Sequence, residues 1–600
     1  MSEDRGMDTP KIAVTVERMD DLPVLVERMK QMQVETIIDQ IVPAHHLWEG
    51  ISKGKLAVGW LAHIVTSGDH RKVHVKEAMT QCHHTMSQLL GIPLSENEFG
   101  DDRLGRLLNG LGQPEVPGEI DCELNLRTIR YYKLDTERAT TRLDSTSVSV
   151  YGDGDGTSVL QYGHSKDHRP DLKQFKVMMA ELDTLGMPLV TQLIRGGDAD
   201  DGLYVPAYEQ MCRATGRNIL VIGDVKMSAL ETRAHIHMQG SRYLTPLANV
   251  GRVPEQMAQW VEEALAGETE KVELYDNEGH PLLQAYERTR WQQAEMPENS
   301  GENSPKRLVE WEERAVLAHS ENVARTAEAS LRRHLSEAKT KLESLTAQRG
   351  RGRRCYRDED VLRKKCEAVL QRHEVAVLVM VKIEPWVTAK TVNAKRGRTA
   401  AGKQAEKRVV EDRRYEVIDV SVDENAVVER VKRLGWRVYV TNCAAKELTV
   451  EQLIAAYHGE WRVEHTLRRL KGRTLSIAPV YVRDEKQIRG LLCLLAIALR
   501  VLTLVEYTVH RALQAEGAML KGVSPVYPTR VTDHPSAELI LSAFKPIELV
   551  IVELAGEMIY QVVALTQMQQ RLLQLMGLPI TLYHDLAQNL SKSALSFSEP

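Results

Sequence analysis

Aromatic residues are scarce in this chain: they make up 5% of 600 residues, and only 4 of them are phenylalanine. Cysteine is also rare. The 7 cysteines are an odd number and lack the paired spacing of a zinc site, so we expect reduced thiols in a cytosol. Cys82, His83 and His84 are adjacent, but no second cluster has zinc-site spacing. We interpret these three as structural or surface residues.

The chain also lacks a long uninterrupted apolar run. The longest, at 491–505, is shorter than the roughly 20 residues that cross a bilayer, and it contains Arg500. We expect a buried helix there, and no membrane partner. The opening MSEDRGMDTPKIAV has no apolar core of the length that a secretory signal needs. The length allows about three or four domains, and we expect an intracellular enzyme.

Neither sign of charge is in large excess. The net charge is −5 and the isoelectric point is about 6.5, which argues mildly against a DNA-binding protein. Global charge does not describe a groove, however, because phosphate contacts depend on local Lys and Arg. Basic residues are concentrated in three segments, at 348–354, 394–408 and 462–473.

The most informative segment is YHGEWRVEHTLRRLK, in which Tyr457, Glu464 and Lys471 are spaced seven residues apart. In one helix, each would be rotated by only about 20° from the last, so all three would face the same way. Trp461 and Arg468 would share that stripe. Such a helix suits a metal ion that meets a phosphodiester backbone. The alternative is an amphipathic surface helix stabilised by salt bridges.

Two aspartates upstream strengthen the first interpretation. Asp144 lies in TTRLDSTSVSVYG among β-branched residues, and Asp224 closes the apolar run NILVIGD. An acid at the end of an apolar strand is usually exposed at the carboxyl edge of a sheet, where ligands of open α/β sheets bind. These two acids and the helical Glu464 therefore predict a two-metal site.

With these residues the chain resembles DDE transposases of bacterial insertion sequences, in the insertion-sequence-four group. That group has a Tyr, Arg, Glu and Lys signature on one helix, and Tyr457, Glu464 and Lys471 have its spacing. Glu460 stands where the family has arginine, whose DNA contact Arg462 or Arg468 could supply. The resemblance runs from roughly 35 to 585. It includes SKDHRPDLKQ at 165–174, GDVKMSALETRA at 223–234 and VYVTN at 438–442.

The resemblance implies an α/β fold whose ribonuclease-H-like core has a mixed sheet with flanking helices. The core would occupy 138–251 and 431–510. A helical N-terminal domain at 1–130 would precede it and could bind DNA ends, and a scaffold role is equally open. A large α+β insertion at 252–430 would interrupt the core, and a helical region at 511–600 would follow.

The local pattern agrees with that core. Three strands joined by tight turns begin near 138, followed by a helix at about 201–215, the strand ending at Asp224, a helix and a strand. In the implied fold, the first and fourth of these strands hold the two acids side by side. In the insertion we predict strands at 271–276 and 282–290, helices at about 313–347 and 358–373, and a strand through VAVLVMVKI.

The implied activity is cut-and-paste DNA transposition, with phosphodiester cleavage and strand transfer by two Mg²⁺ or Mn²⁺ ions. Asp144, Asp224 and Glu464 would be the catalytic and metal-binding residues. Tyr457, Arg462, Arg468 and Lys471 would contact DNA. Weaker candidates for DNA contact, which are by default solvated loop residues, are Lys166, His168, Arg169 and Lys173.

The implied partner is double-stranded DNA, comprising the element's terminal inverted repeats and the target. A homodimer on DNA is expected because two ends must be joined, and the expected location is the bacterial cytoplasm, at the nucleoid. Two alternatives stay open. The protein is a catalytically inactive DNA-binding relative, which Glu460 would favour, or it is a nuclease of the same fold without strand transfer.

Several other motifs have simpler interpretations. DGDG at 153–156 lacks the later ligands of a calcium loop, so we predict a turn. Acids before a helix usually cap it, which is the role we expect for the group Asp198, Asp200 and Asp201. Some relatives stack a tryptophan on a flipped base. The candidates in this chain, each of which core packing would equally explain, are Trp291, Trp311 and Trp386.

Overall fold

The alternating pattern near residue 138 forms three antiparallel strands in the computed structural model: β2 (Thr140–Val150), β3 (Lys173–Leu182) and β4 (Met187–Arg195). Then follow β5 (Leu220–Gly223) and β6 (Arg242–Pro246), which extend the sheet in the order β4-β3-β2-β5-β6. Strand β2 pairs with β5 in parallel, and β5 with β6 in parallel. This mixed sheet is consistent with the predicted ribonuclease-H-like core.

The structure describes residues 12–152, 159–183, 185–251, 253–275, 281–297, 305–346, 355–393, 407–459, 461–524, 526–554 and 557–596. Contacts divide the chain into two units. Unit 1 comprises Met1–Ala248, Trp291–Glu313 and Val440–Pro600, and unit 2 comprises Asn249–Arg290 and Arg314–Tyr439. The functional assignment of the predicted regions stays a prediction. The DGDG motif and the basic loop at 348–354 lie outside the described residues.

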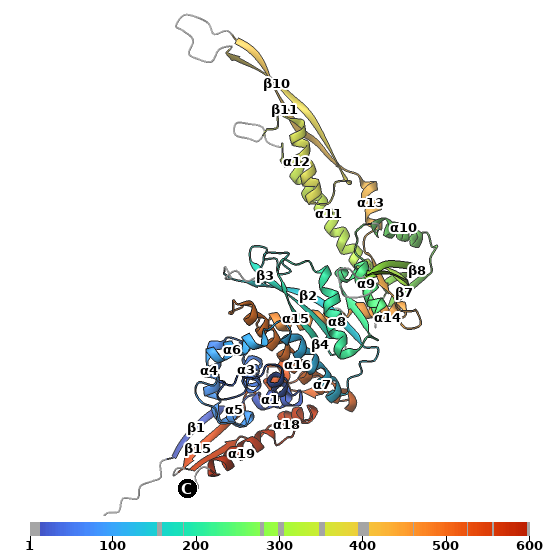
Figure 1. The fold of residues 1–600 in the computed structure, drawn as a ribbon. Helices are drawn as coiled ribbons and strands as arrows, with labels where there is room; N and C mark the ends of the chain where they lie inside the picture. Colours follow the sequence, from blue (N-terminus) through green and yellow to red (C-terminus); the bar gives the residue numbers. More distant parts are fainter. Residues whose placement is uncertain are drawn as a thin grey trace, which may run out of the picture. The chain divides into compact units, whose positions relative to one another are not determined.

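Helices pack around the sheet of unit 1: α7 (Val116–Tyr132), α8 (Tyr204–Thr215), α9 (Leu230–Met238) and α16 (Glu485–Glu516). Helix α16 contains the longest apolar run. It is long and apolar enough to cross a membrane by length and composition alone, but 94% of its most apolar window is buried inside the protein. Figure 1 shows it among the surrounding helices of this unit, as expected of a core helix.

The two ends of the chain meet in a sheet that the sequence did not lead us to expect. Strand β1 (Ile12–Arg18) pairs with β15 (Glu548–Leu554), which pairs with β16 (Glu557–Val562). Figure 1 shows β1 and β15 side by side. Three short strands therefore accompany the helices that we predicted in the terminal regions. Strand β1 is short, and its partner β15 lies more than 500 residues away along the chain, so this pairing leaves no local signal.

The remaining elements of the two terminal regions are mostly helices. Before the core come α1 (Leu22–Gln31), α2 (Val34–Ile41), α3 (Lys53–Ser67), α4 (Lys72–Gln81), α5 (His83–Leu90) and α6 (Asp101–Leu111). After α16 come β13 (Leu520–Lys521), β14 (Val531–Thr532), α17 (Ala537–Ser542), α18 (Gln567–Leu575) and α19 (Leu582–Ser596).

Four further strands continue the order of the large sheet as β12 (Trp436–Thr441), β9 (Lys306–His319), β8 (Pro281–Pro297) and β7 (Lys271–Tyr275). The predicted helix from 313 is wrong in its first part, because residues up to His319 belong to β9. Consecutive residues from Ala315 to Ala318 are buried. A strand covered on both faces reads as a continuous apolar run, which periodicity cannot tell from a helix.

Unit 2 is built on a helical pair and a two-stranded ribbon. Helices α11 (Glu321–Ser344) and α12 (Glu359–Arg372) lie along β10 (Val379–Asn393) and β11 (Lys407–Val422), as Figure 1 shows. Their small core includes Leu342, Leu362, Leu370 and Val420. The unit also contains α10 (Val253–Leu265) and α13 (Glu424–Lys432). The predicted second helix at 358–373 and the strand after it are confirmed.

A buried ion pair explains the arginine that interrupts the apolar run of α16. Arg500 is fully buried, and its Nη2 donates to Oδ1 of Asp121 on α7 at 2.7 Å. The other carboxylate oxygen of Asp121 accepts from the backbone of Thr191 on β4 at 3.1 Å. The pair therefore ties α7 and α16 to the edge of the sheet.

Substitution of Arg500 by Met should lower the free energy of unfolding by about 3–5 kcal/mol, because it leaves the Asp121 carboxylate buried without its partner. Denaturant unfolding measures the change. The double variant Asp121→Leu, Arg500→Met should recover most of the loss, since neither charge then remains. A double variant as unstable as the single one would contradict this account.

Candidate active site

The register of two neighbouring parallel strands places the two predicted aspartates together. Leu143 on β2 pairs with Gly223 on β5, so Asp144 and Asp224 are the next residues along the two strands. Asp144 continues within β2, whereas Asp224 begins the short helix η2 (Val225–Ser228) and accepts from the backbone of Lys226 at 2.9 Å. This register places the two acids side by side, as predicted, where β5 ends and β2 continues.

The hydroxyl of Tyr204 is a further partner of this acid pair, because it donates to Oδ1 of Asp224. Tyr204 lies at the start of α8 and is 1% exposed. Burial and the neighbouring carboxylate of Asp224 hold the pKa of this phenol well above its usual value. Tyr204 is therefore a hydrogen-bond donor that fixes the orientation of Asp224, and no sequence motif pointed to it.

The predicted signature helix is not one helix. Helix α14 (Val450–His458) ends before Gly459, and α15 (Trp461–Lys471) follows. The guanidinium of Arg142 donates to the carbonyl of Ala456 in the last turn of α14, and a Cβ at position 459 would lie 2.5 Å from Nη2 of Arg142. Across such a break, a seven-residue spacing no longer predicts that two side chains lie on the same face. A capping box of Thr449 and Gln452 starts α14.

Tyr457 and Glu464 lie on different helices. Tyr457 is 6% exposed, whereas Glu464 is exposed on α15 together with Trp461 and Arg468. The predicted single helix is therefore wrong, so the seven-residue spacing alone does not place Tyr457 and Glu464 on one face. Glu460 lies outside the described residues.

Helix α15 brings Glu464 to the same cleft as Asp144. This cleft has a volume of about 400 Å³ and is lined by Asp144, Ser145, Thr146, Lys166, Glu464, Leu467, Arg468, Lys471 and Gly472. Glu464 lies in the first turn of α15 and three basic residues lie near its end, which is the favourable orientation for the helix dipole. The structure thus assembles an acid from β2 and an acid from α15 around one opening.

Buried charges hold α15 against the sheet. Asp183, after β3, accepts from Arg142 on β2 and from Arg462 on α15, the latter at 3.0 Å. Two turns further along α15, Arg469 bonds to Glu506 of α16 and Glu538 of α17. Arg462 was predicted to contact DNA, and in the structure one of its nitrogens serves this internal pair.

Lys471 is also engaged inside the protein. Its ammonium contacts Asp167, donates to the carbonyl of Ser147 at 2.8 Å and lies 3.4 Å from Oγ1 of Thr146. It thereby fastens the loop at 164–172 to β2. The loop in turn places Lys166 against Asp144, with 3.2 Å between Nζ and Oδ1.

The other weak candidates in this loop differ in their engagement. Arg169 makes two hydrogen bonds with Asp171, at 2.9 and 2.8 Å, so its charge is already paired. His168 is exposed with a positive φ of 56°, and Lys173 is half-buried at the start of β3. The structure brings none of these three to the lining of the cleft.

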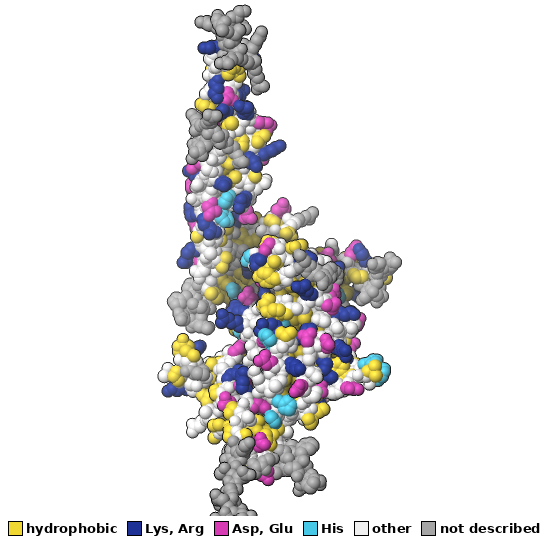
Figure 2. Space-filling model, turned by 90° about the vertical axis from the view of Figure 1, so that its left-hand side faces the viewer, with side chains coloured by type: hydrophobic (Ala, Val, Ile, Leu, Met, Phe, Trp, Pro, Cys, Tyr) yellow, Lys and Arg dark blue, Asp and Glu magenta, His cyan; other side chains and the backbone are white. Residues whose placement is uncertain are grey.

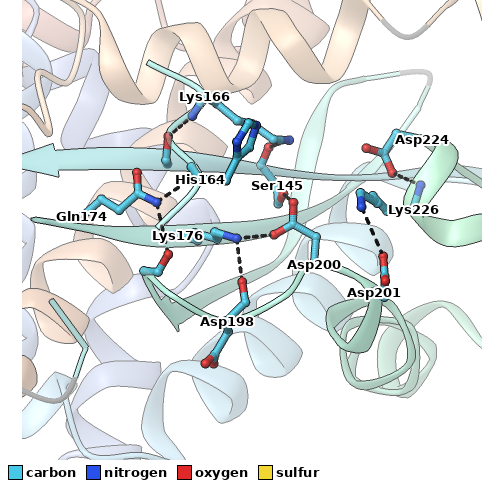
Figure 3. Close-up of polar contacts among 12 residues, drawn as sticks. Ser145, His164, Lys166, Gln174, Lys176, Asp198, Asp200, Asp201, Asp224 and Lys226 are labelled. Atoms are coloured by element: carbon cyan, nitrogen blue, oxygen red, sulfur yellow. Dashed lines mark hydrogen bonds and ion pairs between the residues drawn. The ribbon is translucent and has the colours of Figure 1, made fainter. Parts of the chain in front are cut away.

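Of the predicted capping group Asp198, Asp200 and Asp201, Asp201 lies in the first turn of the helix that follows, but the prediction is wrong for Asp200. Asp200 precedes the short helix η1 (Asp201–Leu203) but makes no side-chain capping bond. Its carboxylate instead accepts from Lys176 on β3 at 2.6 Å and lies 3.5 Å from Oγ of Ser145. Figure 3 shows Lys176 between Asp200 and the backbone of Asp198. A buried lysine on the neighbouring strand outcompetes the helix terminus for this anion.

The electrostatics of the cleft centre on Asp144. Burial raises the pKa of its carboxyl to about 6; the ammonium of Lys166 opposes that rise, and the carboxylate of Asp224 adds to it. On the molecular face seen in Figure 2, Lys and Arg are interspersed with Asp and Glu, in keeping with the small net charge. Local charge is therefore the relevant quantity at this site.

The donor set fits a hard divalent cation. Asp144, Asp224 and Glu464 offer carboxylate oxygens, which Mg²⁺ and Mn²⁺ prefer. Among the described residues, no three side chains of His, Cys, Asp or Glu are grouped closely enough to hold a metal ion. The chemistry of the three acids fits such an ion. In the structure the carboxylate of Asp144 is paired with the ammonium of Lys166.

The sequence pattern of the transposase DDE domain matches residues 136–501, which is more than half of the chain and contains all three acids. The protein belongs to this transposase family. No curated protein matches it. Transposases of this family act on DNA and generally use divalent metals, which is consistent with a cleft lined by Asp144 and Glu464 together with lysine and arginine side chains. The matched segment also includes β2, β5 and α15, whose arrangement defines the cleft.

The tryptophan candidates and the Cys-His cluster of this transposase can also be placed. Trp311 is 2% exposed and donates to Tyr243 at 2.7 Å, so it is a core residue, whereas Trp291 is 74% exposed. Trp386 is half-buried on β10. His84 bonds to Glu17, and Cys82 is a buried free thiol.

Glu181 is a buried acid on β3 next to α15, and its titration tests how α15 packs against the sheet. Burial raises the pKa of Glu181, on β3, from an ordinary 4.5 to about 8, and Thr466 of α15 opposes the rise. The folded state therefore keeps a proton that the unfolded chain releases, so the folded state loses stability as pH rises from about 4.5 to about 8.

The variant Glu181→Gln removes this titration. As the pH rises across that window, the free energy of unfolding of the variant should increase relative to that of wild type, by roughly 1 kcal/mol per pH unit. Denaturant unfolding at several pH values measures it. Parallel pH profiles for the two proteins would contradict the buried, protonated state of Glu181.

Proposed function

We propose that this transposase cleaves DNA at the ends of an insertion sequence and joins those ends to a target, as a member of the insertion-sequence-four group. The observation that carries the proposal is the register of β2 and β5. It makes Asp144 and Asp224 neighbours, and Glu464 lines the same cleft as Asp144. Two carboxylates that line one cleft, with a third beside one of them, are the donor types of two-metal phosphodiester chemistry.

In this proposal Asp144, Asp224 and Glu464 would hold the two Mg²⁺ or Mn²⁺ ions. The ions would supply activation of the attacking water or DNA 3′-hydroxyl and stabilisation of the leaving oxygen. The chain's own residues prepare the acids. Tyr204 holds the carboxylate of Asp224 by its hydroxyl. The ion pairs of Arg462 and Arg469 hold α15, and thereby Glu464, against the sheet.

Several cations and one aromatic ring are placed to meet DNA backbone near the acids. Arg468 is exposed and lines the cleft, and Trp461 is 61% exposed one turn before Glu464. Arg462 keeps 42% of its side chain exposed despite its ion pair. Arginine and lysine position a nucleic acid through its phosphates and carry no sequence information by themselves. We therefore assign this wall to double-stranded DNA, bound by a homodimer that joins two ends.

A catalytically inactive DNA-binding protein is the second candidate, since Glu460 replaces the family's arginine. A nuclease that cuts without strand transfer is the third. The two differ from transposition in their products. An inactive relative binds element ends and leaves them intact, whereas a nuclease yields cut ends that are never joined to a target.

Purified protein should cleave DNA carrying the element's own ends in a Mg²⁺-dependent reaction. The variants Asp144→Asn, Asp224→Asn and Glu464→Gln should each slow cleavage by at least about 10²-fold, because each loses the charge that binds a cation while keeping its shape. A gel assay of cut and joined products measures both steps. End binding in the absence of metal should survive in all three.

Glu451→Gln is the matched control, because Glu451 is an exposed acid on α14 outside the cleft and its loss should leave cleavage unchanged. Wild-type protein that binds ends without cutting them would support the inactive candidate. In that event Glu460→Arg is the variant that should restore cleavage if the missing arginine is the cause.

A further inference from the structure

The cleft contains a lysine, Lys166, that is already paired with the carboxylate of Asp144. Nζ of Lys166 lies 3.2 Å from Oδ1 of Asp144 and also donates to the backbone carbonyl of Ser145. The ammonium thus has two oxygen partners of the kind that a divalent cation would take. The side chain of Lys166 is 36% exposed and that of Asp144 is 18% exposed, so the pair is open to exchange with solutes in the cleft.

The loop that carries Lys166 is held firmly at several points. The backbone nitrogen of Lys166 donates to Oγ of Ser147 at 2.9 Å, and Gln174 donates to the carbonyl of His164 at 2.9 Å. Lys471 bonds to Asp167, the next residue in the loop. The backbone position of Lys166 is therefore set independently of Asp144. Only its flexible side chain has to move for the ammonium to leave the carboxylate.

The other two lysines near the acids are engaged elsewhere. Lys226 follows Asp224 by two residues, yet its Nζ lies 3.7 Å from Asp201, and Figure 3 shows it pointing toward that residue. Lys176 is buried against Asp200 at 2.6 Å. Both ammonium groups are thus paired with acids other than Asp144 and Asp224. Lys166 is thus the lysine whose ammonium contacts an acid of the proposed metal site.

We propose that Lys166 is a resident counter-ion of Asp144, that a divalent cation must displace it, and that the displaced ammonium then binds a phosphate of the DNA. This inference rests on the proposed function, because it takes the metal site to be the one formed by Asp144, Asp224 and Glu464. Lys471 acts in it as a positioning residue, since it holds the loop that presents Lys166.

Two consequences follow from this exchange. The ammonium and the cation compete for one carboxylate, so Lys166 weakens cation binding in the DNA-free protein. Once DNA provides a phosphate for the ammonium, that competition ends, so DNA binding strengthens cation binding. Linkage requires the converse as well, and the cation strengthens DNA binding by the same factor. The protein therefore binds the divalent cation tightly only when DNA is also bound.

Calorimetric titration of Mn²⁺ into the full-length, DNA-free protein tests the competition without using catalysis. Lys166→Met should bind Mn²⁺ about 3-fold or more tightly than wild type, because a partly exposed ion pair no longer opposes binding. Lys166→Arg keeps the charge and should stay near the wild-type affinity. Lys226→Met is the matched control, since it removes a lysine beside the other aspartate and should leave the affinity unchanged.

DNA supplies the second readout. Adding DNA ends should tighten Mn²⁺ binding by wild type and by Lys166→Arg, and by much less in Lys166→Met. Equal Mn²⁺ affinity in Lys166→Met and wild type, with cleavage intact in wild type, would overturn the role of Lys166 and leave the proposed function standing. Absence of Mn²⁺ binding in every protein, together with absence of cleavage, would overturn both.

Discussion

Two carboxylates in neighbouring positions of parallel strands repel each other, and the surrounding side chains reduce that repulsion by donating hydrogen bonds and positive charge to them. Asp144 and Asp224 are adjacent because β2 and β5 pair in one register, and burial of Asp144 makes its charge costly. Tyr204 satisfies one acid with a hydroxyl, and Lys166 satisfies the other with an ammonium. A site of this kind is predisposed to take up cations.

Several charged residues around the acids already have partners inside the protein. Lys471, Arg469 and Arg142 are tied to carboxylates or carbonyls and stabilise the loop and helices that present the acids. Arg468 and Lys166 line the cleft with exposed side chains. Positively charged residues near a DNA-processing site therefore need not all contact DNA. Some of them hold the loop and helices of the cleft in place.

The sequence allowed prediction of those features that depend on local pattern. Alternation located β2, and the apolar run before Asp224 located β5, so the acid pair could be anticipated. Heptad spacing failed at Gly459, because the break depends on Arg142, which lies more than 300 residues away. The same limit hid Tyr204, the Lys176–Asp200 pair and the terminal sheet of β1 and β15. Each depends on tertiary contacts that leave no periodic signal.

The most direct test of this account is the position of Mn²⁺, located by its anomalous X-ray scattering in crystals of the protein bound to DNA ends. The account predicts Mn²⁺ coordinated by Asp144, Asp224 and Glu464, with the ammonium of Lys166 moved from Asp144 to a DNA phosphate. Mn²⁺ bound away from these three acids would contradict the proposed active site. Mn²⁺ bound at the acids with Lys166 still on Asp144 would contradict the exchange.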